Sequence, residues 1–354
     1  MTERQACIAF NLAEGIGSAR VAELSKTAGS IADAWMSYPK KVSRTGGEID
    51  WEGELSLAKR RNVTILTPVD DGYPARLRSM PGHPLALYVK GDASALSKPM
   101  IAMVGTRRPS EYGLRMASRL ASGLAESGWG VVSGLALGID AESHRAALEA
   151  GGVTVGVIGS GLDVFYPEEN IPLARDMVKK GGAVVSEFPF GRPPDRETFP
   201  IRNHVVAALA AGVVAVEAPS RSGTLITMSI AADLGRTAMA VPGRADSRHS
   251  AGCLQLIRDG AILVRNVDDI LEAMSELLPA SRKTPAQTNS SDPETPPYSP
   301  EEALVMLHAD SDGISLDELS RLSGLPPGRI DSIVMGLRIK GFLKFLPGNR
   351  VAAL

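Results

Sequence analysis

The sequence predicts an α/β protein built on a mainly parallel β-sheet. Between Met100 and about Gly243, short apolar runs end in small or basic residues and then open into helix-like segments. Three of these units are MIAMVGTRRPSEYG, GVVSGLALGIDAESH and VVAVEAPSRSGTLITMSIAADLG. A strand, a tight turn and a helix, repeated in this order, are typical of that fold class.

The composition narrows the class of protein. The 354 residues leave room for one large domain and one or two small ones. A formal net charge of −2 excludes a uniformly basic nucleic-acid coat but allows a local basic face. Cys7 and Cys253 are too few for a disulfide framework or a four-ligand zinc site, so we expect no metal. MTERQACIAF does not resemble a secretory leader, and no apolar run reaches membrane-spanning length. We therefore expect a cytoplasmic protein without a membrane contact.

Residues 1–64 are predicted to form a small helical domain. The segment ACIAFNLAEGIGSARVAELSKTAG places Gly15-Ile16-Gly17 between two helix-like stretches. This pattern resembles helix-hairpin-helix and SAM-like modules, which contact the DNA backbone through hairpin amides. A plain pair of helices joined by a glycine turn fits the same residues, so both interpretations stay open.

Residues 65–278 are predicted to form the α/β domain, with VTIL and LALYV as additional strands near its start. Its loops are rich in glycine, which lets a backbone approach phosphate closely, and in arginine, which supplies charge and forked donors. In parallel sheets, ligands bind where strand carboxyl ends meet helix N-termini. We therefore expect this edge of the sheet to bind phosphate groups. The loop residues concerned are Gly105, Gly134, Gly159, Gly161 and Gly223, with Arg107, Arg108, Arg202 and Arg221.

The common nucleotide-cofactor motifs are missing from these loops. The first turn, Gly105-Thr106-Arg107-Arg108-Pro109, lacks the G-x-G-x-x-G spacing of dinucleotide sites, and the chain contains no GxxxxGK[ST] stretch. We therefore expect no cofactor.

Several residues of the domain allow two interpretations. Asp140 and His144, four positions apart on a helix, form either a catalytic dyad or a helix cap with a histidine stacked over it. Glu187 and Glu217, at strand ends, are either a general acid and base or groups that orient arginine and loop amides. Phe165 is either a base-stacking surface beside Tyr166 or part of the core.

The last part of the chain changes in composition. ASRKTPAQTNSSDPETPPYSP has almost no aliphatic residues, so residues 279–299 are predicted to be a disordered linker. Residues 300–354 regain helical periodicity, with Ile330, Ile333, Val334 and Leu337 facing inward, and end in two strand-like segments. Three helices and a hairpin predict a winged-helix domain, which contacts either DNA or protein.

Seven motifs of the chain, in this order, resemble the DprA/Smf (DNA-processing protein A) family. They are VGTRRPSEYG, VVSGLALGIDAESH, VIGSGLDVFYPEEN, VVSEFPFG, FPIRNHVVAAL, SGTLITMSIAADLGR and AVPG. The resemblance covers about residues 65–265. It implies an extended Rossmann-like core that binds single-stranded DNA. It also implies a homodimer that loads the RecA recombinase onto incoming DNA during natural transformation.

The resemblance and the phosphate-binding turns together give the candidate DNA-binding residues. They are Gly105, Thr106, Arg107, Arg108, Ser133, Gly134, Gly159, Gly161, Tyr166, Arg202, Asn203, His204, Ser222, Gly223 and Thr224. The chain departs from the family pattern at His204, where a permanently basic residue is usual, and at Leu254, where asparagine is expected. We expect His204 at the start of a helix, next to phosphate.

An enzymatic function is the alternative hypothesis. The last motif resembles that of Rossmann-like nucleotide phosphoribohydrolases, which carry P-G-G-x-G-T-x-x-E. Here Thr227 holds the position of the catalytic glutamate, and the double glycine is replaced by Ser220-Arg221. We therefore expect no catalytic residues and a protein that is not an enzyme.

Overall fold

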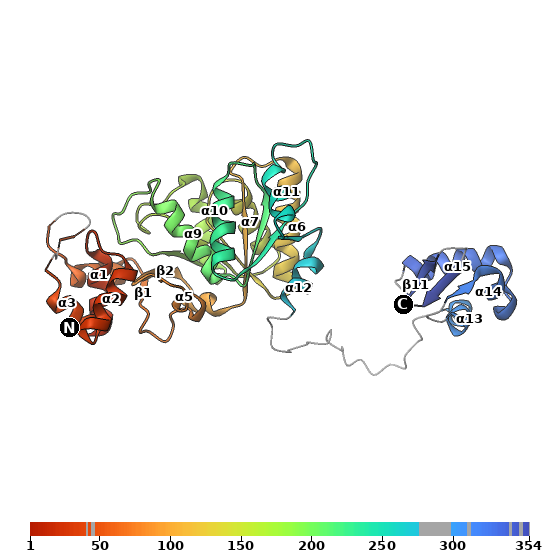
Figure 1. The fold of residues 1–354 in the computed structure, drawn as a ribbon, viewed down its shortest axis with the longest axis horizontal. Coiled ribbons are helices and arrows are strands. Elements are labelled where there is room, and N and C mark those ends of the chain that lie inside the picture. The colour runs from red at the N-terminus through yellow and green to blue at the C-terminus, as the bar shows by residue number, and fades with distance from the viewer. Residues whose placement is uncertain are drawn as a thin grey trace. The chain divides into compact units, whose positions relative to one another are not determined.

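The computed structural model describes residues 1–39, 42–43, 47–275, 299–309, 313–339, 342–346 and 350–353. The chain divides into two compact units, Met1–Ser281 and Arg282–Leu354 (Figure 1). The predicted linker, residues 279–299, lies outside the described residues except for Ser299. No helix in the described part of the chain has the length and apolar character needed to cross a membrane.

One large sheet forms the centre of the first unit. Its strands, in the order β1-β2-β6-β5-β4-β3-β7-β8-β9, run parallel from β6 to β9, and β1 and β2 add an antiparallel edge. The predicted α/β class with a mainly parallel sheet is confirmed. The strands are β1 (Thr64–Leu66), β2 (Leu87–Gly91), β3 (Met100–Gly105), β4 (Gly130–Ser133), β5 (Thr154–Val157), β6 (Ala183–Ser186), β7 (Gly212–Glu217), β8 (Thr237–Ala240) and β9 (Ile262–Leu263).

Helices cover both faces of this sheet, which explains why its central strands are apolar at every position. On β3, Ile101 and Met103 pack with one group of helices, whereas Ala102 and Val104 pack with the other. The first group contains α6 (Glu111–Glu126), α7 (Ile139–Glu149) and α12 (Val267–Met274). The second contains α5 (Ala75–Arg78), α9 (Thr198–Leu209), α10 (Gly223–Asp233) and α11 (Ala251–Arg258). A smaller cluster joins α8 (Ile171–Lys179) to α7.

The strand order creates a switch point between β3 and β7. The chain runs from β3 through β4 and β5 to β6 on one side, and then returns to place β7, β8 and β9 on the other. Connections that leave two neighbouring strands in opposite directions open a crevice at their carboxyl ends. The topology therefore places a binding site after β3 and β7.

The first residues of the unit form a helical layer. It contains α1 (Glu3–Leu12), α2 (Ser18–Ala28), α3 (Ile31–Ser37) and α4 (Trp51–Arg60). Gly15, with φ of 73°, turns the chain between α1 and α2, and the rings of Phe10, Trp35 and Tyr38 pack together in the layer's core. The helix–glycine turn–helix pattern is thus present, and its contact with DNA stays a prediction.

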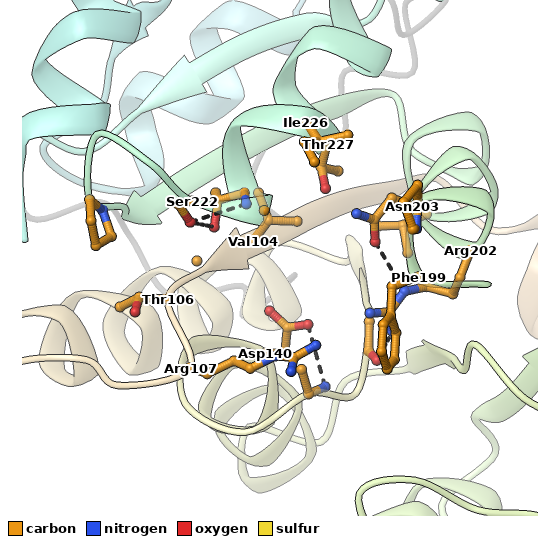
Figure 2. A pocket seen from close by; sticks show the side chains of 18 of the residues that line it. Val104, Thr106, Arg107, Asp140, Phe199, Arg202, Asn203, Ser222, Ile226 and Thr227 are labelled. Atoms are coloured by element: carbon orange, nitrogen blue, oxygen red, sulfur yellow. Dashed lines mark hydrogen bonds between the residues drawn. The ribbon is translucent and has the colours of Figure 1, made fainter. Parts of the chain in front are cut away.

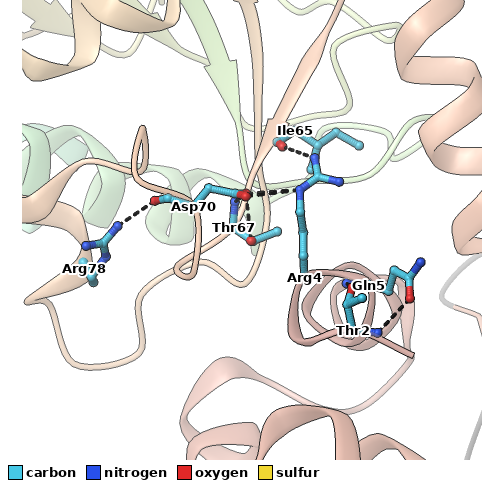
Figure 3. A network of polar contacts seen from close by, with 7 residues as sticks. All are labelled: Thr2, Arg4, Gln5, Ile65, Thr67, Asp70 and Arg78. Atoms are coloured by element: carbon cyan, nitrogen blue, oxygen red, sulfur yellow. Dashed lines mark hydrogen bonds and ion pairs between the residues drawn. The ribbon is translucent and has the colours of Figure 1, made fainter.

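A polar network joins α1 to the strand β1 (Figure 3). The Arg4 guanidinium donates hydrogen bonds to the carbonyl oxygen of Ile65 (2.8 Å) and to Asp70 Oδ2 (3.3 Å). Asp70 also accepts hydrogen bonds from the backbone N–H and the hydroxyl of Thr67 (2.7 and 2.9 Å). These hydrogen bonds therefore attach the helical layer to the edge of the sheet.

The described residues of the second unit form three helices and a small sheet in the order β10-β12-β11. Ile330, Ile333, Val334 and Leu337 are buried, as predicted. The basic residue Lys340 and the turn 347–349 lie outside the described residues. The winged-helix assignment stays a prediction. The elements are α13 (Pro300–His308), β10 (Ile314–Ser315), α14 (Leu316–Ser323), α15 (Pro327–Ile339), β11 (Leu343–Leu346) and β12 (Arg350–Ala353).

Candidate functional site

A pocket of about 460 Å³ lies at the switch point of the sheet (Figure 2). It is formed by the turns after β3, β4 and β7, together with the start of α9 and the first turns of α10. Four arginines and one aspartate line it, which gives the pocket an excess of positive charge. The lining residues include Gly105, Thr106, Arg107, Gly134, Asp140, Arg196, Phe199, Arg202, Asn203, Arg221, Ser222, Gly223, Thr224 and Thr227.

One wall of the pocket is the N-terminus of α10. Ser222 caps this helix: its hydroxyl oxygen accepts the backbone N–H of Thr224 (3.2 Å), and its hydroxyl donates to Thr224 Oγ1 (2.9 Å). The first amides of a helix lack intrahelical acceptors, and the helix dipole favours an anion there. The exposed Arg221 precedes the cap. This wall is therefore suited to a phosphate group, and the contact of Ser222, Gly223 and Thr224 with DNA stays a prediction.

Aromatic rings and arginine side chains lie together on the side of the pocket opposite the N-terminus of α10. The guanidinium carbon of Arg107 lies 5.1 Å from the centroid of the Phe199 ring, within the range of a cation–π contact. The ring of Tyr166, which is 46% exposed, lies 6.0 Å from that of Phe199. Tyr166 and Gly159 line a smaller adjoining hollow with Arg107 and Phe199. The structure thus brings Tyr166 and Gly159 to the same surface as the first glycine turn.

Beneath this surface lies the buried pair Arg202 and Asp140. The Arg202 guanidinium donates to the carbonyl oxygens of Gly134 and Val157 and to Asn203 Oδ1. Burial lowers the pKa of Arg202 to about 10, and the nearby Asp140 opposes that shift. Burial also raises the pKa of Asp140, and Arg202 opposes this. Each group thus favours the charged form of its neighbour.

The glycine at position 134 makes room for the pair. A Cβ atom there would lie 2.5 Å from Arg202 Nη1 and 2.8 Å from Asp140 Oδ2. Arg202 is 6% exposed, and its guanidinium donates hydrogen bonds to oxygen atoms inside the protein. Arg202 thus shapes the pocket from below, and its role as a direct DNA ligand stays a prediction.

Four other candidates lie outside the pocket lining. Ser133 is fully buried, and its hydroxyl donates to the carbonyl oxygen of Met103 (2.6 Å), so its side chain does not reach a ligand. Gly161 donates its N–H to the carbonyl oxygen of Arg192 (2.9 Å) and supports a neighbouring loop. Arg108 is exposed next to the pocket.

His204, the fourth, was expected at the start of a helix, and this expectation is wrong. The helix α9 begins at Thr198, six residues earlier, so His204 sits in its second turn. The side chain is exposed, and Nδ1 lies 3.0 Å from the carbonyl oxygen of Pro200.

The carboxylates at strand ends do not meet in the pocket. Glu217 is buried and accepts hydrogen bonds from the N–H (2.8 Å) and the hydroxyl (2.6 Å) of Ser110, so it orients the loop that follows β3. Glu187 lines a different hollow, near α1 and Ile201. Phe165 packs against the core cluster around Leu135. Glu217 therefore orients a loop rather than acting as a general acid or base, and Phe165 belongs to the core rather than to a base-stacking surface.

Asp140 and His144 do not form a dyad that faces the pocket. His144 is fully buried, with Nδ1 2.6 Å from Thr154 Oγ1, and the Thr154 hydroxyl donates to the carbonyl oxygen of Val131. Since the Thr154 proton is already used, Nδ1 of His144 carries the proton that it donates to Thr154. Burial lowers the pKa of His144 to about 3, so the imidazole is neutral.

This burial predicts an acid-sensitive fold. An unfolded histidine takes up a proton near pH 6.5, whereas folded His144 does so only near pH 3. The unfolded chain therefore binds more protons between these values, and the free energy of unfolding falls by about 1.4 kcal/mol for each pH unit below 6.5. Chemical denaturation of wild type and His144→Gln at pH 7.5, 6 and 5 measures this: the variant should show the shallower decline. Parallel declines would exclude His144 as the cause.

Arg196, Phe199 and Thr227 line the pocket but were not among the candidate residues. Arg196 and Phe199 stand just before the segment that contains Arg202 and Asn203, within DRETFPIRNH. A cation and an aromatic residue next to a predicted anion-binding turn are the signal that could have identified them.

The fold and the pocket define a class: a Rossmann-like α/β protein with an arginine-lined crevice at its switch point. Residues 64–275 match the family model described as DNA recombination-mediator protein A, and the chain belongs to this family. The family places it among proteins of DNA processing and recombination, as the sequence motifs had indicated.

Relatives support this assignment along most of the chain. Protein Smf of Escherichia coli is 33% identical, in an alignment that covers 90% of this chain and 83% of that protein. The crystal structure of DNA processing protein A from Streptococcus pneumoniae is similar with a TM-score of 0.63 and 32% identity, covering 77% of this chain and 98% of that one. DNA processing protein A from Helicobacter pylori, described for its single-stranded DNA binding mode, gives a TM-score of 0.55 at 27% identity, covering 61% of this chain and 97% of that one.

Proposed function

We propose that the pocket and the surface around it bind single-stranded DNA, and that the protein loads a RecA recombinase onto that DNA during natural transformation. The single-stranded DNA binding described for the Helicobacter pylori relative supports the first part. The second part rests on membership of a recombination-mediator family. We further propose that the protein acts as a homodimer in the cytoplasm.

The observation that carries the proposal is the combination of groups in one pocket. Arg107, Arg196 and Arg221 supply exposed positive charge for phosphates, and the α10 N-terminus supplies the positive end of the helix dipole. Phe199 and Tyr166 supply ring faces on which bases can stack. Bases that are already paired in a duplex are not free to stack on these rings. The combination therefore favours a single strand.

We also propose that the protein is not an enzyme and needs no cofactor. Thr227 holds the position at which the phosphoribohydrolase motif has its catalytic glutamate, and a hydroxyl cannot replace a carboxylate in that chemistry. Incubation with nucleoside 5′-monophosphates should release no free base. Base release that disappears in Thr227→Val would instead favour the enzymatic alternative.

The RecA part is tested by following RecA assembly on a circular single strand. Assembly should become faster when the protein is present, and the gain should be lost when Arg107 and Arg221 are both replaced by alanine. Unchanged assembly with a wild-type protein that does bind the strand would show that DNA binding is not coupled to recombinase loading.

His204 provides a test of how far the DNA extends beyond the pocket. The side chain is exposed on α9, beside Asn203, which lines the pocket. If a phosphate lies against it, affinity should rise as the pH falls from about 8 to 6, through the ordinary histidine range. His204→Arg should then strengthen binding at pH 8 and flatten this dependence, because arginine stays charged. Identical pH profiles for both proteins would place His204 outside the DNA path.

A further inference from the structure

A second hollow, of about 390 Å³, lies between α8 and the segment Leu162–Phe165, over the strands β2 and β6. We call it the α8 groove. On its floor, Lys90 of β2 pairs with Val184, near the amino end of β6. The pocket at the switch point lies instead at the carboxyl ends of β3 and β7, and the two hollows share no lining residue. The α8 groove is therefore a separate surface of the first unit.

The walls of the α8 groove are apolar. Ile171, Ala174 and Val178 are spaced by three and four positions, so they lie on one face of α8. Leu162 and Phe165 contribute from the segment that faces this helix, and these two residues and Val178 are only partly buried. Apolar side chains that remain partly in contact with water gain free energy when another apolar group covers them. The groove is therefore suited to receive apolar side chains.

The charged residues that line the groove are all cations. Arg175 and Lys179 are exposed one turn apart on α8, and Lys90 is half-buried. Lys90 donates a hydrogen bond to the carbonyl oxygen of Arg61, which holds its ammonium group in place. Lys179 Nζ lies 3.9 Å from Asp176 Oδ1, an exposed ion pair of a kind that contributes little to stability. The rim of the groove therefore carries positive charge that a negatively charged partner can use.

Apolar walls and a cationic rim together fit a peptide segment that carries both apolar and acidic side chains. The apolar side chains would fill the hollow, and the carboxylates would meet the cations of the rim. A membrane surface fits less well, because a helix that enters a lipid surface presents protruding apolar side chains, whereas those of the groove line a hollow.

We propose that the α8 groove is the docking site for an acidic, apolar segment of a partner protein. Apolar side chains of that segment pack against Val178 and Phe165, and its carboxylates pair with Arg175 and Lys179. Because the groove and the pocket at the switch point are lined by different residues, the protein can hold this partner and a ligand of the pocket at the same time.

The test is selection of displayed random peptides on the full-length protein, followed by fluorescence anisotropy with the most enriched peptide. The enriched peptides should combine Asp or Glu with Leu, Ile, Phe or Trp. Replacing Arg175 and Lys179 together by glutamate should weaken binding of the chosen peptide about ten-fold, because two exposed ion pairs become repulsive contacts. Val178→Ser, which removes apolar groups from the wall, should weaken it about five-fold. Neither variant should change the affinity for oligo(dT).

The matched control replaces Arg115 and Arg119 by glutamate, because these exposed arginines are also one turn apart on a helix, α6, and do not line the groove. It should bind the peptide as wild type does. A melting curve for each variant shows whether it is folded; if Val178→Ser unfolds, the charge reversal at the exposed positions still decides.

Three results would overturn the proposal. The first is a selection without enriched peptides, or with peptides that bind the Arg175 and Lys179 variant as tightly as wild type. The second is a dimer that this variant converts to monomers in sedimentation, which would show that a second copy of the chain covers the groove. The third is binding to phosphatidylglycerol vesicles that the variant loses, which would assign the groove to a membrane surface.

Discussion

Replacing Arg202 by methionine should lower the free energy of unfolding by about 3–5 kcal/mol, the range for removing one partner of a buried charge pair. The variant loses the hydrogen bonds to the carbonyl oxygens of Gly134 and Val157 and leaves Asp140 buried without its neighbouring cation. Methionine has a similar length and an apolar stem, so packing is disturbed little. Denaturant titration of both proteins at pH 7.5 measures the loss.

The pH dependence of this loss separates the charge effect from a packing effect. Without Arg202, the pKa of Asp140 rises further above its unfolded value, because burial is then opposed only by the hydrogen bonds from Ala136, Ser133 and Gly134. The folded variant binds more protons than the unfolded chain, so its stability increases as the pH falls and Asp140 becomes neutral. The deficit relative to wild type should therefore shrink toward pH 5. Arg196→Met, at an exposed position, is the control and should change stability by less than about 0.5 kcal/mol. A deficit of the same size at every pH would show that Asp140 does not depend on Arg202.

Replacing Arg107 by alanine should weaken single-stranded DNA binding by about 1–3 kcal/mol, the range for hydrogen bonds to charged groups. Arg107 is exposed on the first glycine turn, and its guanidinium also lies against Phe199. The variant therefore removes a phosphate contact and loosens the ring that a base would stack on. The dependence of affinity on salt should fall by less than about one unit in the logarithmic slope. Fluorescence anisotropy at several salt concentrations measures both quantities.

The control for Arg107 is Arg119→Ala, which removes an exposed arginine from α6, away from the pocket. It tests whether the effect comes from the position of the charge or only from the net charge of the protein. Equal losses in the two variants would mean that DNA does not dock at the pocket.

The sequence predicted the sheet well because its evidence is local. Apolar runs such as Met100–Gly105 and Gly212–Glu217 are buried on both faces. Such runs can be identified as strands from the sequence alone, without knowledge of the strands that they pair with. The two-residue strand β10 was not predicted, because it is defined only by its pairing with β12. The edge of the sheet that carries the pocket was predicted from its glycine and arginine residues, since backbone freedom and charge are properties of the residue itself.

The roles of individual side chains depended on tertiary contacts and were harder to predict. Arg202 resembles a phosphate ligand in the sequence, yet α9 places it over the carbonyl oxygens of two neighbouring turns. Phe199 was not among the candidate residues, and the structure places it half-buried beside two arginines. His204 was misplaced because α9 starts at Thr198, before Pro200, which helices tolerate in their first turn.

The most direct test of the account is competition between single-stranded and double-stranded DNA of the same sequence for the wild-type protein, without ATP, at low and moderate salt. We predict that the single strand binds more tightly at both salt concentrations and that replacing Arg107 and Arg221 together by alanine removes most of this preference. Equal or tighter binding of the duplex, or a preference that survives the double replacement, would contradict the assignment of this pocket as the single-strand site.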